Sequence, residues 1–185
     1  DKIYAARFGA EGILKGDLID LTDVPSSTIA KLAHTPASAI GSCRRKLTDA
    51  DYPTVIETLK KFNIDCFFYN GGNDSMDTVA KLSAYAKMRG YEIRVMGVPK
   101  TIDNDVWGTE TSFGFDTAVT IATEAIDRLH STASAHQRVM VIEVMGDKAG
   151  WIALHSGMAG GGDIILIPEL EYNIRNICLL YTSPS

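Results

Sequence analysis

Short apolar segments alternate with longer amphipathic segments through the middle of the chain. Apolar side chains spaced three or four apart predict helices over about 53–62 and 74–89. Uninterrupted apolar runs predict buried strands over 66–69 and 93–98. This alternation of strand and helix is typical of a parallel sheet with crossover helices. The apolar face of the first of these helices consists of Val55, Ile56, Leu59 and Phe62.

The same alternation continues in the second half of the chain. The pattern predicts helices over about 116–129 and 150–159, and buried strands over 139–144 and 163–168. Together with the first half this makes four strands with helices between them. The expected fold class is therefore α/β, an incomplete three-layer sandwich with a mostly parallel sheet and crossover helices.

The two ends of the chain are less regular. The sequence pattern predicts a strand over 2–8 and a short helix over 26–33. A helix starting near Glu171 loses its pattern in the final letters CLLYTSPS, so we expect 171–185 to be a truncated tail whose last eight or so residues are not native. Without an internal repeat or a low-complexity linker, residues 1–170 are expected to form one domain or part of one.

Composition narrows the class of protein. With 185 residues, 45% of them hydrophobic, the chain has enough apolar material for one sizeable core, which excludes disordered, collagen-like and disulfide-scaffold classes. A net charge of −5 leaves no basic field for a nucleic-acid backbone. No apolar run approaches a membrane span and no signal peptide is recognisable. Three scattered cysteines without a zinc spacing favour a reducing cytoplasm and no structural metal.

Three polar loops follow predicted strands, where ligands bind in open parallel sheets. They are NGGNDS at 70–75, PKTIDND at 99–105 and EVMGDKAGW at 143–151. The first can cradle a phosphate at a helix N-terminus, although its glycines also fit an ordinary tight turn. The second places two carboxylates and a hydroxyl on one side, which suits metal–phosphate chemistry, although a solvated Asx-rich turn has the same composition. The proximity of the first two loops favours a site over two unrelated turns.

Signatures of other α/β classes are absent. The sequence contains no P-loop string, no GxGxxG dinucleotide fingerprint and no GxSxG nucleophile elbow. The segments GGNDS, PKTIDND, SAHQR and the MGxxAGW segment occur in order between about Gly41 and Glu169. In this combination the sequence resembles the phosphofructokinase family, which transfers a phosphoryl group to the 1-hydroxyl of fructose 6-phosphate.

The resemblance implies a role for each matching position. Asp103 is expected to accept the proton of the sugar 1-hydroxyl, with Asp74 and Lys100 completing the catalytic group. Asn73 and Asp105 resemble the part of the site that holds Mg²⁺. The phosphate-binding positions are Gly71, Gly72 and Arg44. The sugar-phosphate-binding positions are Thr101, Ile102, Asp103, Arg138, Met145, Gly146 and Asp147.

Two of these positions bear on the phosphoryl donor. Asp74 and Lys100 stand where ATP-dependent members typically have glycine, and both replacements resemble the pyrophosphate-dependent branch. The Asp74 side chain adds bulk and negative charge where the α-phosphate of a nucleotide would lie. Lys100 adds a cation that can stabilise charge on the transferring phosphate. We therefore expect pyrophosphate and fructose 6-phosphate as the substrates.

Departures from the family pattern keep other hypotheses open. Asn73 replaces the usual Asp, and Asp147 stands where many members have Arg. An ATP-dependent enzyme and a degenerate, non-catalytic subunit that binds sugar phosphate both remain alternatives. Arg138 resembles the Arg that reaches a sugar bound to a neighbouring subunit, which implies a homo-oligomer. The resemblance identifies residues 1–170 as the partial donor-binding domain of a longer enzyme, so we expect this piece alone to be inactive.

Overall fold

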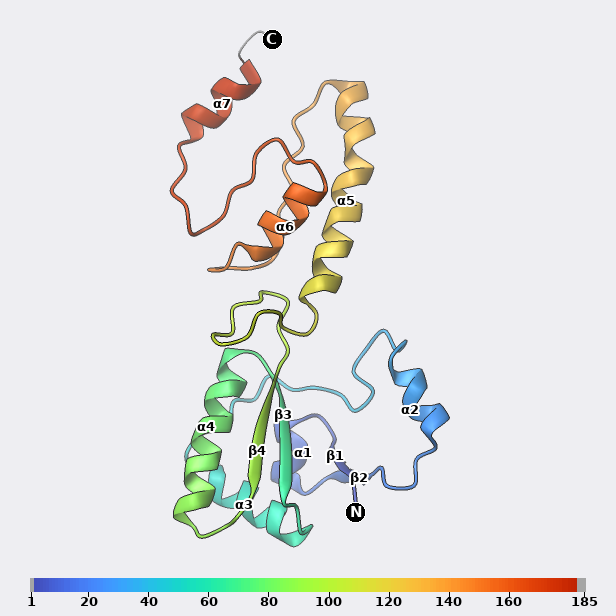
Figure 1. Cartoon of the computed structure of the whole chain (residues 1–185), viewed down its shortest axis with the longest axis vertical. Helices are drawn as coiled ribbons and strands as arrows, with labels where there is room; N and C mark the ends of the chain where they lie inside the picture. The colour runs from blue at the N-terminus through green and yellow to red at the C-terminus, as the bar shows by residue number, and fades with distance from the viewer. Residues whose placement is uncertain (1, 183–185) are drawn as a thin grey trace. The chain divides into compact units, whose positions relative to one another are not determined.

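The computed structural model describes residues 2–182, which divide into two compact units (Figure 1). The first unit holds the chain up to Tyr69 together with Asp74–Val98. The second holds Asn70–Asn73 and the chain from Pro99 onward. Asn70–Asn73, here called the glycine turn, and the segment PKTIDND are distant in sequence but belong to the same unit.

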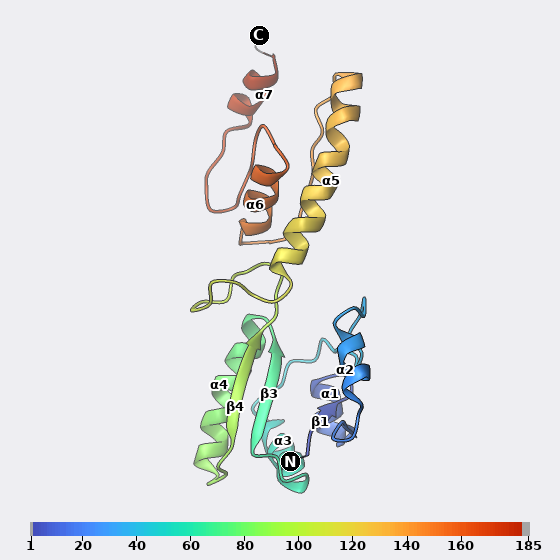
Figure 2. The same cartoon turned by 45° about the vertical axis from the view of Figure 1, so that its right-hand side comes forward.

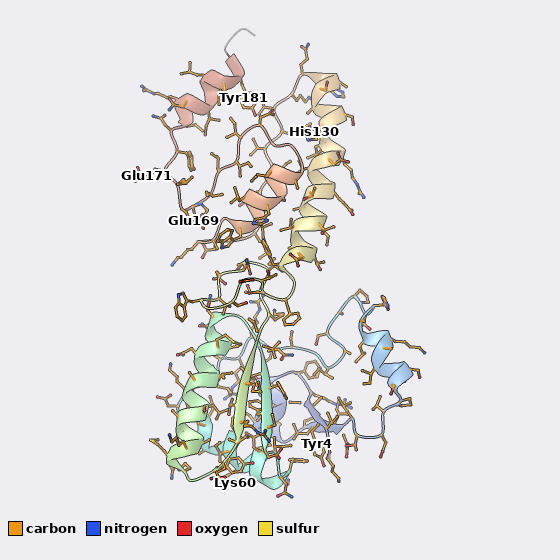
Figure 3. The ribbon with its side chains drawn as sticks, viewed as in Figure 1. Tyr4, Lys60, His130, Glu169, Glu171 and Tyr181 are labelled. Atoms are coloured by element: carbon orange, nitrogen blue, oxygen red, sulfur yellow. The ribbon has the colours of Figure 1, made fainter. Side chains whose placement is uncertain are left out.

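The first unit begins with two short antiparallel strands that are connected by a helix. Its elements in chain order are β1 (Tyr4–Ala6), α1 (Ala10–Lys15), β2 (Leu18–Asp20) and α2 (Ser26–Leu32). The two strands pair antiparallel, with Ala5 opposite Ile19. The Tyr4 ring, labelled in Figure 3, meets the Phe62 ring edge-on with centroids 5.3 Å apart. The strand predicted over 2–8 and the helix predicted over 26–33 are confirmed, both shorter than expected.

A strand–helix–strand unit forms the larger part of the first unit and extends into the glycine turn. It consists of β3 (Cys66–Gly71), α4 (Asn73–Met88) and β4 (Arg94–Pro99). Arg94 N donates to Asp65 O at 3.0 Å and Lys100 N to Gly71 O at 2.9 Å, so the register is the same at both ends and the strands run parallel. Figures 1 and 2 show the strands side by side with α4 along them. The predicted parallel α/β arrangement is confirmed here.

The core of the first unit lies between its helices and one face of β3 and β4. Helix α3 (Tyr52–Lys61) contributes Val55, which has no exposed surface. Helix α4 approaches β4 closely at Gly97, whose added Cβ would lie 2.5 Å from Met76 Sδ. Each large aliphatic side chain buried in this way stabilises the fold by about 1.5–3 kcal/mol. The buried core residues are Ala10, Ile13, Leu47, Tyr52, Val55, Ile56, Leu59, Leu82 and Ala86.

The second unit is built on two packed helices. They are α5 (Phe115–His136) and α6 (Trp151–Ala159), which pack against each other. At Gly160, which ends α6, an added Cβ would lie 2.7 Å from Ile126 Cγ2, so only glycine permits this close approach. His130 Nε2 on α5, labelled in Figure 3, lies 2.5 Å from the Gly160 carbonyl oxygen. These contacts fix the end of α6 against α5.

Two strand predictions are wrong. Residues 139–144 and 163–168 lack strand structure, although both segments carry the expected apolar side chains. A strand requires a neighbour that accepts and donates its backbone hydrogen bonds. Among residues 2–182 no strand pairs with either segment, and Val141 remains 92% exposed. The apolar pattern identified segments suited to burial in a sheet but could not supply their partners.

Two helix predictions are corrected at their ends. Helix α5 runs to His136, beyond the predicted end at 129, and stops where Gln137 adopts the left-handed conformation. In the tail, α7 (Ile174–Thr182) begins after Asn173, whose Oδ1 accepts the Arg175 N–H at 2.9 Å. The helix expected from near Glu171 therefore starts later than predicted and continues to Thr182. That the last residues of the tail are not native stays a prediction, and residues 183–185 lie outside the described part of the chain.

Within residues 2–182 no helix is both long and apolar enough to cross a membrane.

Candidate active site

The glycine turn and the PKTIDND segment meet at the carboxyl ends of β3 and β4. The ladder between these strands ends with the bond from Lys100 N to Gly71 O. A Cβ added at Gly72 would lie 3.8 Å from Thr101 Cβ, so the two loops are in van der Waals reach. This position, just beyond parallel strands, is where open α/β sheets bind ligands.

A side-chain hydrogen bond links the two loops. Asn73 Nδ2 donates to Asp105 Oδ2 at 2.7 Å. The two residues expected to hold a metal are therefore adjacent, although they are 32 positions apart in the sequence. Thr101 Oγ1 accepts the backbone N–H of Asp103 at 3.2 Å, which sets the direction of the chain between them.

Asp103 differs from Asp74 and Asp105 in that one of its carboxylate oxygens is buried without a hydrogen-bond partner. It is partly buried, and within residues 2–182 its Oδ1 is shielded from solvent and has no hydrogen-bond partner. Burial raises the pKa of its carboxyl, and the neighbouring charges of Asp105 and Asp147 raise it further. A buried oxygen without a partner is costly, so such a group marks a candidate functional residue.

A cavity of about 420 Å³ opens beside Asp103. Its other walls come from the segment Glu143–Asp147. Gly146 has φ 149°, and a Cβ there would lie 2.2 Å from the Ala149 carbonyl oxygen, so the turn requires glycine. The structure therefore brings the predicted sugar-binding positions Met145, Gly146 and Asp147 together with Asp103.

Of the two residues expected to set the donor, only Asp74 has a side-chain partner within the described part of the chain. Asp74 lies in the first turn of α4, and its Oδ2 is 2.5 Å from Lys46 Nζ. Lys100 is exposed, and its side chain makes no ion pair or hydrogen bond within the described part of the chain. The counter-ion of Asp74 is thus Lys46, which the sequence analysis did not single out.

Three other predicted site residues lie outside the cavity. Arg44 is exposed in the first unit, and Arg138 is exposed just after α5. Ile102 packs within the loop, its Cγ2 lying 3.3 Å from where a Cβ on Gly114 would stand. Their roles as ligands of phosphate or sugar remain predictions.

The structure adds residues that sequence reasoning missed. Glu143 lines the cavity, and Asn104 is hydrogen-bonded within its loop. Both lie inside motifs that the sequence analysis did examine. The signal that could have identified Lys46 is the basic run RRK at 44–46, but its pairing with Asp74 depends on the fold.

The donor set fits Mg²⁺ in part. Residues 2–182 contain no cluster of three or more acidic, His or Cys side chains placed to hold a metal ion. Mg²⁺, however, keeps several waters and is held by one or two carboxylates together with substrate phosphates. The bond between Asn73 Nδ2 and Asp105 Oδ2 leaves the amide oxygen and the second carboxylate oxygen available. This pair therefore suits a metal that arrives with a phosphate.

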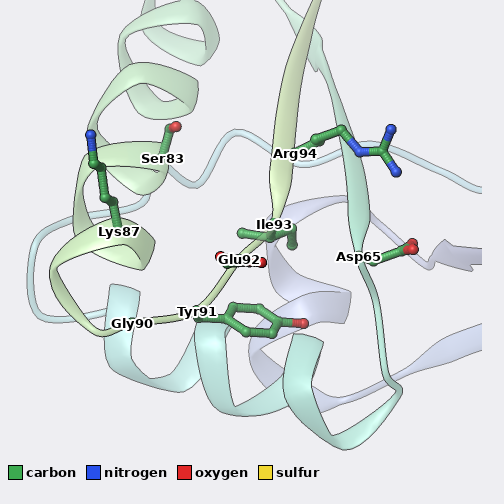
Figure 4. Close-up of a pocket in the computed structure, with 8 residues that line it drawn as sticks. All are labelled: Asp65, Ser83, Lys87, Gly90, Tyr91, Glu92, Ile93 and Arg94. Carbon is green, nitrogen blue, oxygen red and sulfur yellow. The ribbon is translucent and has the colours of Figure 1, made fainter.

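A larger cavity, of about 710 Å³, lies at the opposite end of β4 (Figure 4). Lys87 and Arg94 contribute cations to its wall, and Asp65 and Glu92 contribute anions. Its charges balance, and it holds none of the residues of the loops described above. Cavity size is therefore a poor guide here, and we place the site at Asp103.

The fold and the loops at the strand ends define an α/β protein with a candidate site beyond β3 and β4. The chain matches the family described as "Phosphofructokinase" over residues 1–182 and belongs to that family. Its parallel strands β3 and β4, connected through α4, are consistent with an α/β fold.

Similar proteins include members named for either donor. The chain is 50% identical over 184 residues to the ATP-dependent 6-phosphofructokinase 3 of Bacteroides thetaiotaomicron, covering 95% of this chain and 52% of that protein. It is 43% identical over 179 residues to the pyrophosphate–fructose 6-phosphate 1-phosphotransferase of Streptomyces coelicolor, covering 96% and 50%. The crystal structure of a pyrophosphate-dependent phosphofructokinase from Marinobacter aquaeolei matches with a TM-score of 0.83 and 41% identity, covering 97% of this chain and 47% of that one. The chain spans about half the length of the curated relatives it matches.

Proposed function

We propose that the protein containing this chain transfers a phosphoryl group to the 1-hydroxyl of fructose 6-phosphate, a glycolytic reaction. The observation that supports this most directly is Asp103. Its carboxyl lies on the wall of the cavity, carries a shielded oxygen without a partner and has a raised pKa. A carboxylate with a raised pKa is a stronger base, which suits the removal of a hydroxyl proton.

In this mechanism Asp103 takes the proton of the sugar hydroxyl as the oxygen attacks phosphorus. The new bond joins that oxygen to phosphorus, the bridging P–O bond breaks, and the leaving phosphate keeps the electron pair. General-base help of this kind typically contributes about 10²–10⁴-fold. Thr101 holds the turn before Asp103. The segment Met145–Asp147 lines the same cavity as Asp103, and we assign to it the contacts with the sugar.

The glycine turn and the two residues Asn73 and Asp105 act on the phosphoryl donor. Gly71 and Gly72 give a phosphate access to the backbone at the N-terminus of α4. Asn73 and Asp105 are the residues that would hold Mg²⁺. When bound, the metal neutralises charge on the donor phosphates.

We assign pyrophosphate as the donor because of Asp74 and Lys100. The Asp74 side chain occupies space at the start of α4 that a glycine would leave to a nucleotide. Its charge is paired with Lys46, so the obstacle to a nucleotide is mainly steric. Lys100 is exposed and available to a phosphate.

ATP is the second candidate donor. It is favoured by the 50% identity to a relative named as ATP-dependent. Replacing Asp74 and Lys100 with glycine distinguishes the two: the pyrophosphate assignment requires the double variant to lose preference for pyrophosphate. We further propose that the complete protein is a cytoplasmic homo-oligomer in which Arg138 reaches the sugar phosphate of a neighbouring subunit.

The role of Asp103 is tested by Asp103→Asn in the full-length protein. Because an amide cannot accept the proton, we expect kcat to fall by about 10²–10⁴-fold with fructose 6-phosphate binding retained. Formation of fructose 1,6-bisphosphate measures the turnover. A variant with wild-type kcat would remove Asp103 from the mechanism.

A further inference from the structure

Asn104 occupies an unusual backbone position between the two carboxylates of the TIDND motif. Its φ is 53°, in the left-handed region that residues other than glycine seldom adopt and that Asn tolerates better than most. On either side of this turn, Asp103 and Asp105 lie in different environments. Asp103 is partly buried on the cavity wall, whereas Asp105 is exposed and accepts the hydrogen bond from Asn73.

The Asn104 side chain closes the loop that follows. Its Nδ2 donates to the Glu110 carbonyl oxygen at 3.1 Å, and its Oδ1 accepts the Ser112 N–H at 2.8 Å. Both groups of the amide are therefore used across the loop from 104 to 112. Such side-chain bonds replace the backbone bonds that a loop lacks.

The far side of this loop is firmly anchored. Ser112 is 2% exposed, and its carbonyl oxygen accepts the Phe115 N–H at 3.2 Å, at the start of α5. Phe113 N donates to the Pro99 carbonyl oxygen at 2.9 Å, next to β4. Asn104 thus connects the motif to a point fixed by both α5 and β4.

We propose that Asn104 is a positioning residue, whose amide clamp on Glu110 and Ser112 holds Asp103 and Asp105 in their separate orientations for the reaction. The proposal rests on the proposed function only for its kinetic consequence; the clamp itself is a property of the fold. Misplacing a catalytic group by about 1 Å can cost about 10²-fold in rate. Loss of the clamp should therefore lower kcat while leaving the contacts that bind sugar phosphate in place.

The test uses Asn104→Gly in the full-length protein. Glycine accepts the left-handed backbone but removes both side-chain bonds. We expect kcat to fall by roughly 10–100-fold with KM for fructose 6-phosphate within about threefold of wild type. Asn63→Gly is the matched control, because Asn63 also has φ 53° and lies in the turn after α3. An unchanged kcat in Asn104→Gly would overturn the proposal.

Amide hydrogen exchange at Ser112 provides a readout without turnover. The Ser112 N–H should be protected in wild type and in Asn63→Gly, and should exchange faster in Asn104→Gly. If the wild-type protein shows no turnover, the proposed function fails. The exchange rate of Ser112 N–H still shows whether the Asn104 side chain holds the loop. Equal protection in wild type and Asn104→Gly contradicts it.

A second variant covers the case in which Asn104→Gly does not fold. Asn104→Asp keeps an acceptor for Ser112 but loses the donor to Glu110. We expect Ser112 to stay protected and kcat to fall by less than in the glycine variant, roughly 3–10-fold. Wild-type kcat, or an unprotected Ser112, would again overturn the proposal.

Discussion

The carboxyl of Asp103 is partly buried and faces the charges of Asp105 and Asp147. Each of these features disfavours its ionised form and raises its pKa. A folded protein tolerates such an arrangement where it serves a reaction. The unfavourable burial of this carboxylate is consistent with a general base whose pKa is raised by its surroundings.

Removing one neighbouring charge should therefore change the pH profile. Asp147→Asn deletes a like charge, so the pKa of Asp103 falls and the carboxylate stays ionised to lower pH. We expect the acid limb of the kcat profile to move to lower pH. Asp163→Asn, a change at an exposed carboxylate outside the cavity, is the control and should leave the limb unchanged. Movement of the Asp147→Asn limb to higher pH would contradict the assignment of Asp103 as base.

Lys46 offers a second prediction at this scale. Its ion pair with Asp74 neutralises a carboxylate beside the proposed donor site. In Lys46→Gln that charge is uncompensated and repels pyrophosphate, so we expect KM for pyrophosphate to rise about 3–10-fold at low salt, an effect of roughly 1 kcal/mol. Steady-state kinetics at two ionic strengths measure it.

The control for this change is Lys31→Gln, on the exposed helix α2. It alters the net charge equally without touching Asp74. If both variants raise KM to the same extent, the effect is one of overall charge, and Lys46 has no specific role at the donor site.

Single residues show where sequence reasoning succeeded and where it could not. The strand-end rule placed the loops at 70–75 and 99–105 at one edge of the sheet, because parallel strands bring their carboxyl ends together. The resemblance to the family then singled out Asn73 and Asp105 within those loops. The pairing of Asp74 with Lys46 was not predictable, since no periodicity relates residues so far apart. The clamp of Asn104 depends on a left-handed backbone that the sequence alone does not specify.

Among the elements, α4 is central because it connects the two parallel strands and begins at the glycine turn. Its Leu82 is 1% exposed in the core, whereas Met88 at its end is 76% exposed. We expect Leu82→Ala to lower the free energy of unfolding by about 2–5 kcal/mol. Urea unfolding measures it, and Met88→Ala should cost far less. Equal costs would mean that α4 does not pack as described.

The elements also show the limits of patterns. Helices α3 and α4 were predicted closely, because an amphipathic helix satisfies its own backbone hydrogen bonds and shows its buried face in its spacing. The short helix α1 was not predicted. Strands β3 and β4 form because each has the other as partner. Residues 139–144 have a comparable apolar pattern but no paired strand in the described chain. A strand depends on what lies beside it, which its own residues do not encode.

At the scale of the whole molecule, the chain comprises two compact units and spans about half the length of its curated relatives. The second unit contains the proposed base, the two residues proposed to hold the metal and the proposed sugar contacts. They lie within Asn70–Asn73 and Pro99–Asp147. Activity is a property we assign to the complete protein.

The most direct measurement of the central claim is phosphoryl transfer by the full-length protein to fructose 6-phosphate in the presence of Mg²⁺, with pyrophosphate and ATP compared as donors. We predict turnover with pyrophosphate and little with ATP. Turnover with ATP alone would contradict the donor assignment and leave the sugar site intact. A folded protein that transfers from neither donor would contradict the proposed reaction itself and favour a subunit that binds sugar phosphate without catalysis.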